Sequence, residues 1–298
     1  MDTGVTAQDA RQTGQSHDDI MRSFRLLQYD DTTMDDLYEK TASDFLELAS
    51  EQRLHILLKL QDGTTNVSVI AKELDATVPE VYRNFERLSK ADLISKNPDG
   101  SYGITTIGKM FCSQVSLINF ISRNKKYFKA HDFDQLPFKY IQRLGALQSG
   151  QHVKGFVKVQ ERWKDVYKNA EKYIYNILFE VPYTPDITEL LVKRISSGVM
   201  LRSIWSESAI IPKDRKQALE KFKEQIQQGK IERKMQDDVK TIVILNEKEA
   251  GVMFPASGEV DMSEAFFSDD KMFHEWCLDY FKDCWDSAGP FRETKLKE

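Results

Sequence analysis

Cysteines, signal sequences and long apolar runs are scarce or missing in this sequence. Its three cysteines among 298 residues, Cys112, Cys277 and Cys284, are too few and too scattered to form a disulfide framework. Cys277 and Cys284 would share one helix face but lie about two turns apart, which is too far to bridge. No apolar run approaches the ~20 residues that span a bilayer, and no signal peptide is visible at the start. We therefore expect a reduced, cytoplasmic protein with no membrane partner.

The motifs of common enzyme classes are also missing. There is no GxGxxG after a strand, no Walker loop and no GxSxG elbow, and the five histidines show no metal-ligand spacing. His152-Val153-Lys154 matches the start of the phospholipase D signature H-x-K-x4-D, but Val159 stands at the acid position and no second copy exists. Because that chemistry needs two such units, the match indicates a coincidence or a relic. We expect no catalytic residue, no metal and no cofactor.

The charge balance is mildly acidic, with 42 Lys and Arg against 47 Asp and Glu and a net charge of −5. This argues against a nonspecific nucleic-acid coat protein. It leaves room for a site-specific regulator, because only a local patch must face the phosphates. The alternative for such a patch is a solvated helix face. The basic residues in question are Arg83, Arg87, Lys90, Lys96, Lys109, Arg123, Lys125, Lys126 and Lys129, with no acid between Lys109 and Lys129.

The stretch from Val67 to Lys109 has the pattern of a winged helix-turn-helix. A short helix over 67–74 is followed by a three-residue turn and a second helix over 78–91. Thr77 and Glu80 have the spacing of a capping box at the start of the second helix. Two strand-like segments then flank Asn97-Pro98-Asp99-Gly100, an order of residues that favours a type I turn and so predicts the wing. Thr105 is expected to cap a further helix.

The second helix of this motif divides into an apolar and a basic face. Val81, Phe85 and Leu88 recur at helical spacing and predict a buried stripe. Arginine suits guanine and asparagine suits adenine, so Arg83, Asn84 and Arg87 are expected to reach base edges in the major groove. Lys90, Lys96 and Tyr102 would hold phosphates or minor-groove edges. The predicted DNA-contacting set is Thr77, Arg83, Asn84, Arg87, Lys90, Lys96 and Tyr102. Glu80 and Glu86 lie near this face and would repel phosphates.

Helices are also expected on both sides of the winged motif. Residues 1–43 are read as a flexible tail and a short helix, and 51–60 as a helix that braces the motif. The apolar helical pattern over 110–128 favours a homodimer, because symmetric DNA sites are read by two-fold dimers. The alternative is that this helix simply covers the rest of the chain.

The second half of the chain predicts an α/β domain over 153–287. Strand-like runs at 173–179 and 199–205 flank a helix over 187–196, which indicates a parallel βαβ unit. A charged helix over 214–228, three strands near 231–235, 241–245 and 251–254, and a helix over 268–287 with a buried aromatic stripe complete it. Arg202 and Trp205, near a strand end, are the guess for an effector pocket, although such residues are more often structural.

Several segments resemble archaeal ArsR/TrmB-like winged-helix regulators. They are Arg53-Leu54-His55-Ile56-Leu57, Val81-Tyr82-Arg83-Asn84-Phe85-Glu86-Arg87-Leu88, Ala91-Asp92-Leu93-Ile94 and Asp99-Gly100-Ser101-Tyr102-Gly103-Ile104-Thr105. The second half is similar in pattern to the sensor domain named for the regulator of methanogenesis and filament formation. That likeness runs through His131-Asp132, Arg143-Leu144-Gly145, Gly198-Val199 and Val252-Met253-Phe254.

This resemblance covers residues ~44 to ~287 and implies homodimeric, site-specific control of transcription. It implies a mixed α+β chain, in which a winged helix-turn-helix precedes a non-catalytic sensor domain with a phospholipase-D-like α/β fold. The amino-terminal extension, Glu80 and Glu86 depart from the family pattern.

The chain is expected to divide into five parts. They are a flexible tail and short helix over 1–43, a DNA-binding domain over 44–110, a dimerisation helix and connector over 111–152, the effector domain over 153–287 and a tail over 288–298. The expected function is a DNA-binding transcriptional regulator that responds to a small-molecule effector or partner. The alternative is a winged-helix adaptor of the transcription machinery that does not read DNA.

Overall fold

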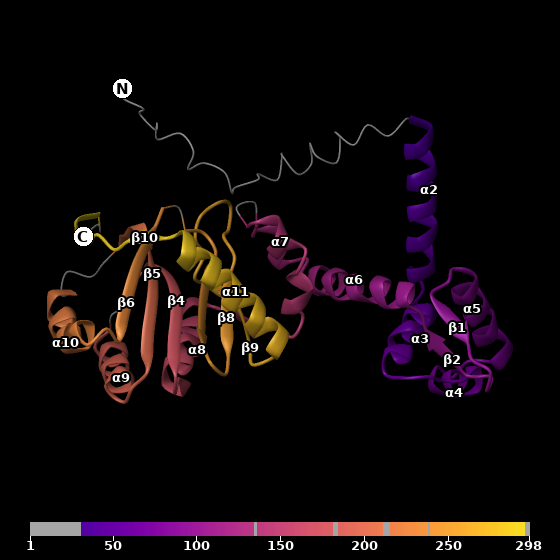
Figure 1. Ribbon diagram of the computed structural model, residues 1–298, viewed down its shortest axis with the longest axis horizontal. Coiled ribbons are helices and arrows are strands. Elements are labelled where there is room, and N and C mark those ends of the chain that lie inside the picture. The colour runs from indigo at the N-terminus through magenta and orange to yellow at the C-terminus, as the bar shows by residue number, and fades with distance from the viewer. Residues whose placement is uncertain (1–30, 134–135, 181–183, 211–214, 238, 296–298) are drawn as a thin grey trace, which may run out of the picture. The chain divides into compact units, whose positions relative to one another are not determined.

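The computed structural model describes residues 31–133, 136–180, 184–210, 215–237 and 239–295 (Figure 1). These residues form two compact units, one ending at Ile118 and the other beginning at Asn119. The expected fold class is confirmed, because a winged helix-turn-helix precedes an α/β domain built on a single sheet. No helix in the described ranges is long and apolar enough to cross a membrane. The predicted flexible tail lies almost wholly outside the described residues.

The first unit has the element order that the sequence predicts for a winged helix. Its elements are α2 (Asp31–Leu48), α3 (Glu51–Gln61), α4 (Val67–Glu73), α5 (Val78–Lys90), β1 (Ile94–Lys96), β2 (Tyr102–Ile104) and α6 (Thr106–Arg123). α4 and α5 are the helix-turn-helix, and α5 is the predicted recognition helix. β1 and β2 pair antiparallel and form the wing.

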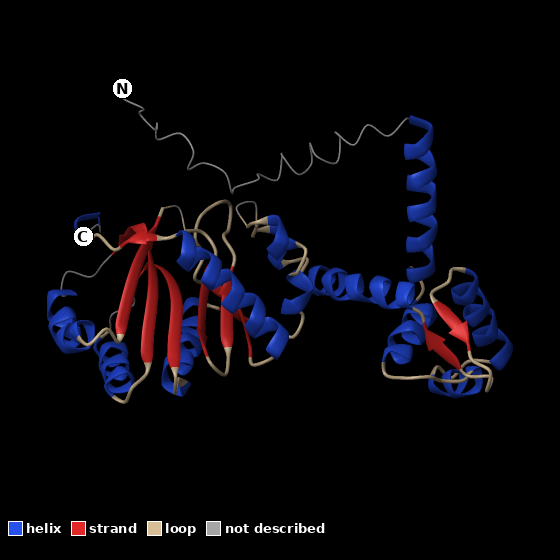
Figure 2. Cartoon of the chain, viewed as in Figure 1, coloured by secondary structure: helices blue, strands red, loops and turns tan. Residues whose placement is uncertain are grey.

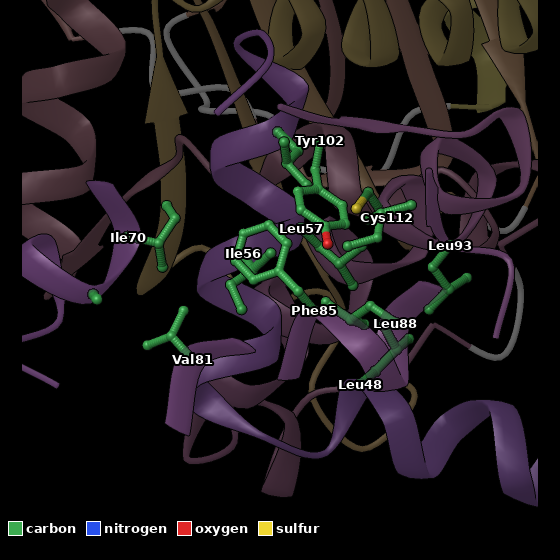
Figure 3. Packing of buried hydrophobic residues seen from close by; sticks show 13 residues of the cluster. Leu48, Ile56, Leu57, Ile70, Val81, Phe85, Leu88, Leu93, Tyr102 and Cys112 are labelled. Atoms are coloured by element: carbon green, nitrogen blue, oxygen red, sulfur yellow. The ribbon is translucent and has the colours of Figure 1, made fainter. Parts of the chain in front are cut away.

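One hydrophobic core holds this unit together (Figure 3). The predicted stripe of α5 is confirmed, since Val81, Phe85 and Leu88 are fully buried. The ring of Phe85 meets the ring of Tyr102 edge-on, with 4.7 Å between centroids. Truncating Phe85 to alanine would leave a cavity and cost about 3–5 kcal/mol. The same core includes Leu48 of α2 and Cys112 of α6, so both flanking helices are anchored to it.

The wing and the cap after it also follow the prediction. The backbone N–H of Gly100 donates to the carbonyl of Asn97 at 3.0 Å, which closes the expected turn. Gly100 has φ +86°, a left-handed conformation that glycine adopts without strain. Thr105 caps α6, because its hydroxyl accepts from the N–H of Gly108 at 3.0 Å. A side chain at Gly108 would meet the carbonyl of Leu93 at 2.1 Å, so only glycine fits there.

The second unit is organised around an eight-stranded sheet with the order β10-β6-β5-β4-β7-β8-β9-β3 (Figure 2). The strands are β3 (Gln151–Lys154), β4 (Tyr173–Glu180), β5 (Met200–Ile210), β6 (Ile231–Gln236), β7 (Ile242–Asn246), β8 (Ala250–Met253), β9 (Glu264–Ser268) and β10 (Gly289–Pro290). The predicted parallel pair β4–β5 and hairpin β7–β8 are confirmed. β6 extends the parallel part, and every other pairing in the sheet is antiparallel.

Helices cover both faces of this sheet. They are α8 (Phe156–Asn169), α9 (Pro185–Ser196), α10 (Arg215–Gln227) and α11 (Lys271–Ser287). Tyr175 stacks on Phe281 of α11, whereas the neighbouring Asn176 donates to the Tyr167 hydroxyl of α8 at 3.1 Å. Because consecutive strand residues point to opposite faces, α11 lies on one face and α8 on the other. The aromatic stripe of α11 is buried, as predicted.

Short elements connect α6 to this sheet. They are η1 (Tyr127–Lys129), α7 (Phe138–Ile141) and η2 (Leu144–Leu147), and η3 (Glu293–Lys295) lies near the end of the chain.

The prediction for the second unit was wrong in three places. The strand β9 was not foreseen, and β3 lies where a connector was expected. The supposed tail from 288 begins with β10, which pairs with β6 and places Phe291 against Trp205.

Candidate nucleic-acid interface

The outward face of α5 carries two cations that have no partner in the described part of the chain. Arg83 and Lys90 are exposed, and neither side chain forms an ion pair or hydrogen bond with another described residue. They lie opposite the buried stripe of the helix, because around the helix axis Arg83 and Lys90 point about half a turn away from the buried residues Val81, Phe85 and Leu88. The exposed Glu86 lies on the same side. This face therefore offers free N–H donors to a ligand, with one carboxylate among them.

Arg87 is exposed but is held by α2. Its Nε donates to Oε2 of Glu47 at 3.1 Å, and its Nη2 donates to Oε1 of the same carboxylate. This hydrogen bonding raises the pKa of Arg87 above its ordinary value. Glu47 also lies 3.2 Å from Nε of the buried Arg53. Arg53 in turn donates to the carbonyls of Leu46 and Glu47, at 2.7 and 2.8 Å. Glu47 is thus a fixed partner, with a side chain only 14% exposed.

Asn84 is half-buried and is held by α3. Its Nδ2 donates to Oε1 of Gln52 at 2.6 Å. The Nε2 of Gln52 donates in turn to Oε1 of Glu80 at 2.8 Å. This short chain of amides and a carboxylate links both helices at the amino-terminal end of α3. Of the three predicted base readers, only Arg83 has no side-chain partner among the residues that the structure describes.

The predicted capping box at Thr77 does not form. Thr77 has the extended backbone of an N-cap, but its side chain makes no capping hydrogen bond. Pro79 at the second helical position has no N–H to offer, and the carboxylate of Glu80 is bound to Gln52 instead of turning back. Thr77 itself is exposed at the start of α5.

The two predicted wing residues have different surroundings. Lys96 is exposed, with its Nζ 5.9 Å from the ring centroid of Tyr102. Tyr102 is only 6% exposed, and its ring belongs to the core beside Phe85. Tyr102 therefore positions the wing, whereas Lys96 is the wing residue that presents a charge. The remaining members of the predicted basic patch, Lys109, Arg123, Lys125, Lys126 and Lys129, are all exposed.

Arg202 and Trp205 do not form one pocket. Arg202 lies between the rings of Tyr175 and Trp285, with centroids 5.7 and 5.4 Å away, on the α11 side of the sheet. Trp205, three positions along β5, is 2% exposed and packs against Phe291 on the other side. Side chains alternate between the two faces of a sheet, so residues an odd number of positions apart on one strand lie on opposite faces. The prediction of a shared pocket overlooked this alternation.

The H-x-K sequence lies on the edge strand β3. His152 Nε2 is 2.7 Å and Lys154 Nζ is 3.0 Å from the same oxygen of Glu264 on β9. Burial lowers the pKa of His152, although Glu264 opposes this effect. Nearby, His131 stacks on Tyr127 and lies 2.8 Å from Asp261. The carboxylate of Glu264 thus ties β3 to β9, and the contact of His131 with Asp261 ties the segment after η1 to the segment before β9.

The three cysteines are free and buried, and burial raises the pKa of Cys284 to about 11. The thiols therefore stay protonated near neutral pH. Within the described ranges, no three His, Cys, Asp or Glu side chains are arranged to hold a metal ion.

No family model and no curated protein matches this chain. Among solved structures, the archaeal chromatin protein TrmBL2, whose structure is described as showing a novel mode of DNA binding, is similar over 79% of this chain and 92% of its own. Its identity is 13% and its TM-score 0.39. The phospholipase D family member Nuc from Salmonella typhimurium is similar over 48% of this chain and 99% of its own, with 15% identity and a TM-score of 0.37. A riboflavin-derivative dimethyltransferase, RosA from Streptomyces davawensis, is similar over 70% of this chain and 68% of its own, with 11% identity and a TM-score of 0.28. None of these similarities assigns the chain to a family.

Proposed function

We propose that this protein is a sequence-specific, DNA-binding regulator of transcription. The observation that carries the proposal is a pair of exposed cations, Arg83 and Lys90, that have no partner among the described residues and lie on the outer face of the second helix of a winged helix-turn-helix. Such a helix enters the major groove and places its outer side chains at base edges and phosphates. The exposed Lys96 adds a third cation on the wing.

One observation favours the adaptor function instead. Glu86 is exposed between these cations, and a carboxylate that enters a groove is repelled by the phosphates. A mixed-charge helix face of this kind also suits a protein partner of the transcription machinery. The two functions differ in whether duplex DNA is bound with a sequence preference.

We propose further that the regulator acts as a homodimer through α6. Four large apolar side chains of this helix are exposed: Ile107 at 46%, Met110 at 66%, Ile118 at 46% and Ile121 at 37%. Together with Gln114 they recur at three- and four-residue intervals and form one narrow stripe along most of this 18-residue helix. A stripe of this type is what a second copy of the same helix would cover.

The α/β domain is proposed to be non-catalytic and to bind an effector or a partner. It has its own core, and it joins the winged helix through α6, the same helix that carries the apolar stripe. A ligand that favours one arrangement of the dimer would change DNA affinity by the difference in its affinity for the two arrangements.

The test of DNA reading is selection of bound duplexes from a random pool, followed by affinity measurements at several salt concentrations. We expect a palindromic consensus with half-sites about one helical turn apart, and an affinity that falls steeply with salt. If no consensus emerges and binding is weak even at low salt, DNA reading is wrong and the adaptor function takes its place.

The test of the dimer is the mass in solution of a Met110→Glu/Ile118→Glu variant, measured by light scattering. We expect the wild type to be a dimer and the variant a monomer. The matched control is Ser113→Glu/Ser116→Glu, which adds the same charges to other positions of α6. A variant that stays dimeric while the control behaves like the wild type would rule out α6 as the interface.

A further inference from the structure

We infer that two residues outside the recognition helix, Glu47 and Gln52, determine which bases Arg87 and Asn84 select. This inference rests on the proposed DNA-reading function and adds to it the source of base preference. Glu47 belongs to α2 and Gln52 to α3, and each is hydrogen-bonded to one side chain of α5. Both contacts consume particular donors, so they decide which hydrogen-bonding groups remain for a base pair.

For Arg87, the contact occupies one edge of the guanidinium. Glu47 accepts from Nε and from Nη2, which leaves both hydrogens of Nη1 and the second hydrogen of Nη2. Those remaining hydrogens lie at the end of the side chain and point away from the carboxylate. Two donors side by side match the O6 and N7 acceptors of guanine. Arg87 is therefore pre-oriented for guanine, in a side chain that would otherwise sample many rotamers.

Glu47 is suited to this role because it does not depend on Arg87 for its charge balance. The guanidinium of Arg53 lies 3.2 Å from the same carboxylate and anchors the end of α2 through two backbone carbonyls. The carboxylate is therefore fixed before DNA arrives, and it keeps a cationic partner throughout.

For Asn84, the contact occupies one of two amide hydrogens. Its Nδ2 donates once to Gln52, which leaves one Nδ2 hydrogen and the Oδ1 acceptor. One donor beside one acceptor matches N7 and N6 of adenine. The amide of Gln52 cannot turn over freely, because its Nε2 donates to Glu80. Gln52 thus fixes which way the Asn84 amide faces, and Glu80 fixes Gln52.

Arg83 provides the contrast within the same helix. It has no partner among the described residues, so all of its donors remain available in any rotamer. We assign Arg83 to affinity and Arg87 and Asn84 to selectivity. Glu47 and Gln52 are positioning residues that act through the other two.

The experiment compares base preference in wild type, Glu47→Gln and Gln52→Met, using the duplex that the wild type selects and its single-base changes. Glu51→Gln and Gln61→Met are matched controls, since both residues are exposed on α3 and neither has a hydrogen bond to α5. We expect each positioning variant to lose most of a preference of roughly tenfold or more at one position, guanine for Glu47→Gln and adenine for Gln52→Met. The controls should keep both preferences.

A double variant separates positioning from damage to the fold. In an Asn84→Ala background, Gln52→Met should change base preference no further, because the side chain it positions is gone. An equal additional loss in that background would overturn the inference for Gln52.

Three further outcomes would each overturn the inference. If Glu47→Gln tightens binding to every duplex equally without changing the preference, Glu47 is an electrostatic competitor and the inference is wrong. If the wild type selects a consensus and both variants keep it, the inference fails while DNA reading stands. If the wild type selects no consensus, DNA reading itself fails and the inference falls with it.

Discussion

The cations of α5 and the cations of the C-terminal sheet differ in what surrounds them. Arg83 and Lys90 are exposed and have no partner within the described ranges. Arg202 is bound to Glu232 at 3.0 Å and lies between two aromatic rings. Lys234 donates to the carbonyl of Trp285 at 2.6 Å and lies over its ring.

This difference separates two roles of the same residue types. A cation whose donors are used and whose side chain lies on aromatic rings contributes to folding. A cation with free donors on an exposed helix face is available for binding a ligand. Arg87 has features of both, because it is exposed yet paired with Glu47. The four predictions below test this division.

Reversing the charge of the outer face of α5 should have the largest effect. We expect Arg83→Glu/Lys90→Glu to weaken duplex binding by about 100-fold or more, because two phosphate or base contacts become repulsions. Fluorescence anisotropy with the selected duplex measures this, with Lys193→Glu, an exposed change on α9, as the control. Unchanged affinity in a folded variant would mean that α5 does not face DNA. Arg87→Glu is a poorer test, since it also places two carboxylates together at Glu47.

Removing a cation of the sheet should affect stability and leave DNA binding intact. We expect Arg202→Ala to lower the free energy of unfolding of the α/β domain by about 1–2 kcal/mol, through the lost ring contacts and ion pair. Urea denaturation measures the loss, and anisotropy checks that affinity for the duplex is unchanged. A large drop in DNA affinity at full stability would place Arg202 in the binding function.

Removing the wing cation should have a smaller effect on binding. We expect Lys96→Ala to weaken binding a few-fold for every sequence alike and to reduce the salt slope by about 0.9, the contribution of one phosphate contact. Affinities at four salt concentrations provide the slope, with Lys59→Ala on α3 as the control. A changed base preference would contradict a role in phosphate contact.

The smallest effect concerns pH. Burial lowers the pKa of His152 in the folded state, so the unfolded chain binds more protons below about pH 6.5. The free energy of unfolding should therefore fall as the pH drops through that region. We expect His152→Gln to reduce this loss between about pH 7 and pH 5 in urea denaturation. Identical curves for both proteins would show that His152 does not set the pH dependence.

Local patterns predicted the winged helix almost completely. The spacing of Val81, Phe85 and Leu88 indicated the buried face, and the order of residues at Asn97–Gly100 indicated the turn. Both signals depend on neighbours within a few positions, so the sequence contains them in full. The βαβ unit was predicted for the same reason.

Contacts outside the βαβ unit and the hairpins, between segments far apart in the sequence, were not predicted. β9 pairs with β3, and Phe266 is the register partner of His152 on the neighbouring strand. Neither of these short strands has a sequence pattern strong enough to predict the pairing. Likewise, nothing near Arg87 in the sequence indicates Glu47, which lies 40 positions away on α2. The sequence predicted that Arg83 and Lys90 face away from the core, but only the fold shows which donors of the polar side chains of α5 are already used.

The continuity of α6 has a practical consequence for dissecting the protein. The boundary between the two compact units falls inside this helix, between Ile118 and Asn119. A fragment cut at that boundary would end in an open helix turn, whose last carbonyls have lost their N–H partners. It would also lose Ile121 from the apolar stripe. Either unit should therefore be prepared with the whole of Thr106–Arg123, so that one helix is present in both fragments.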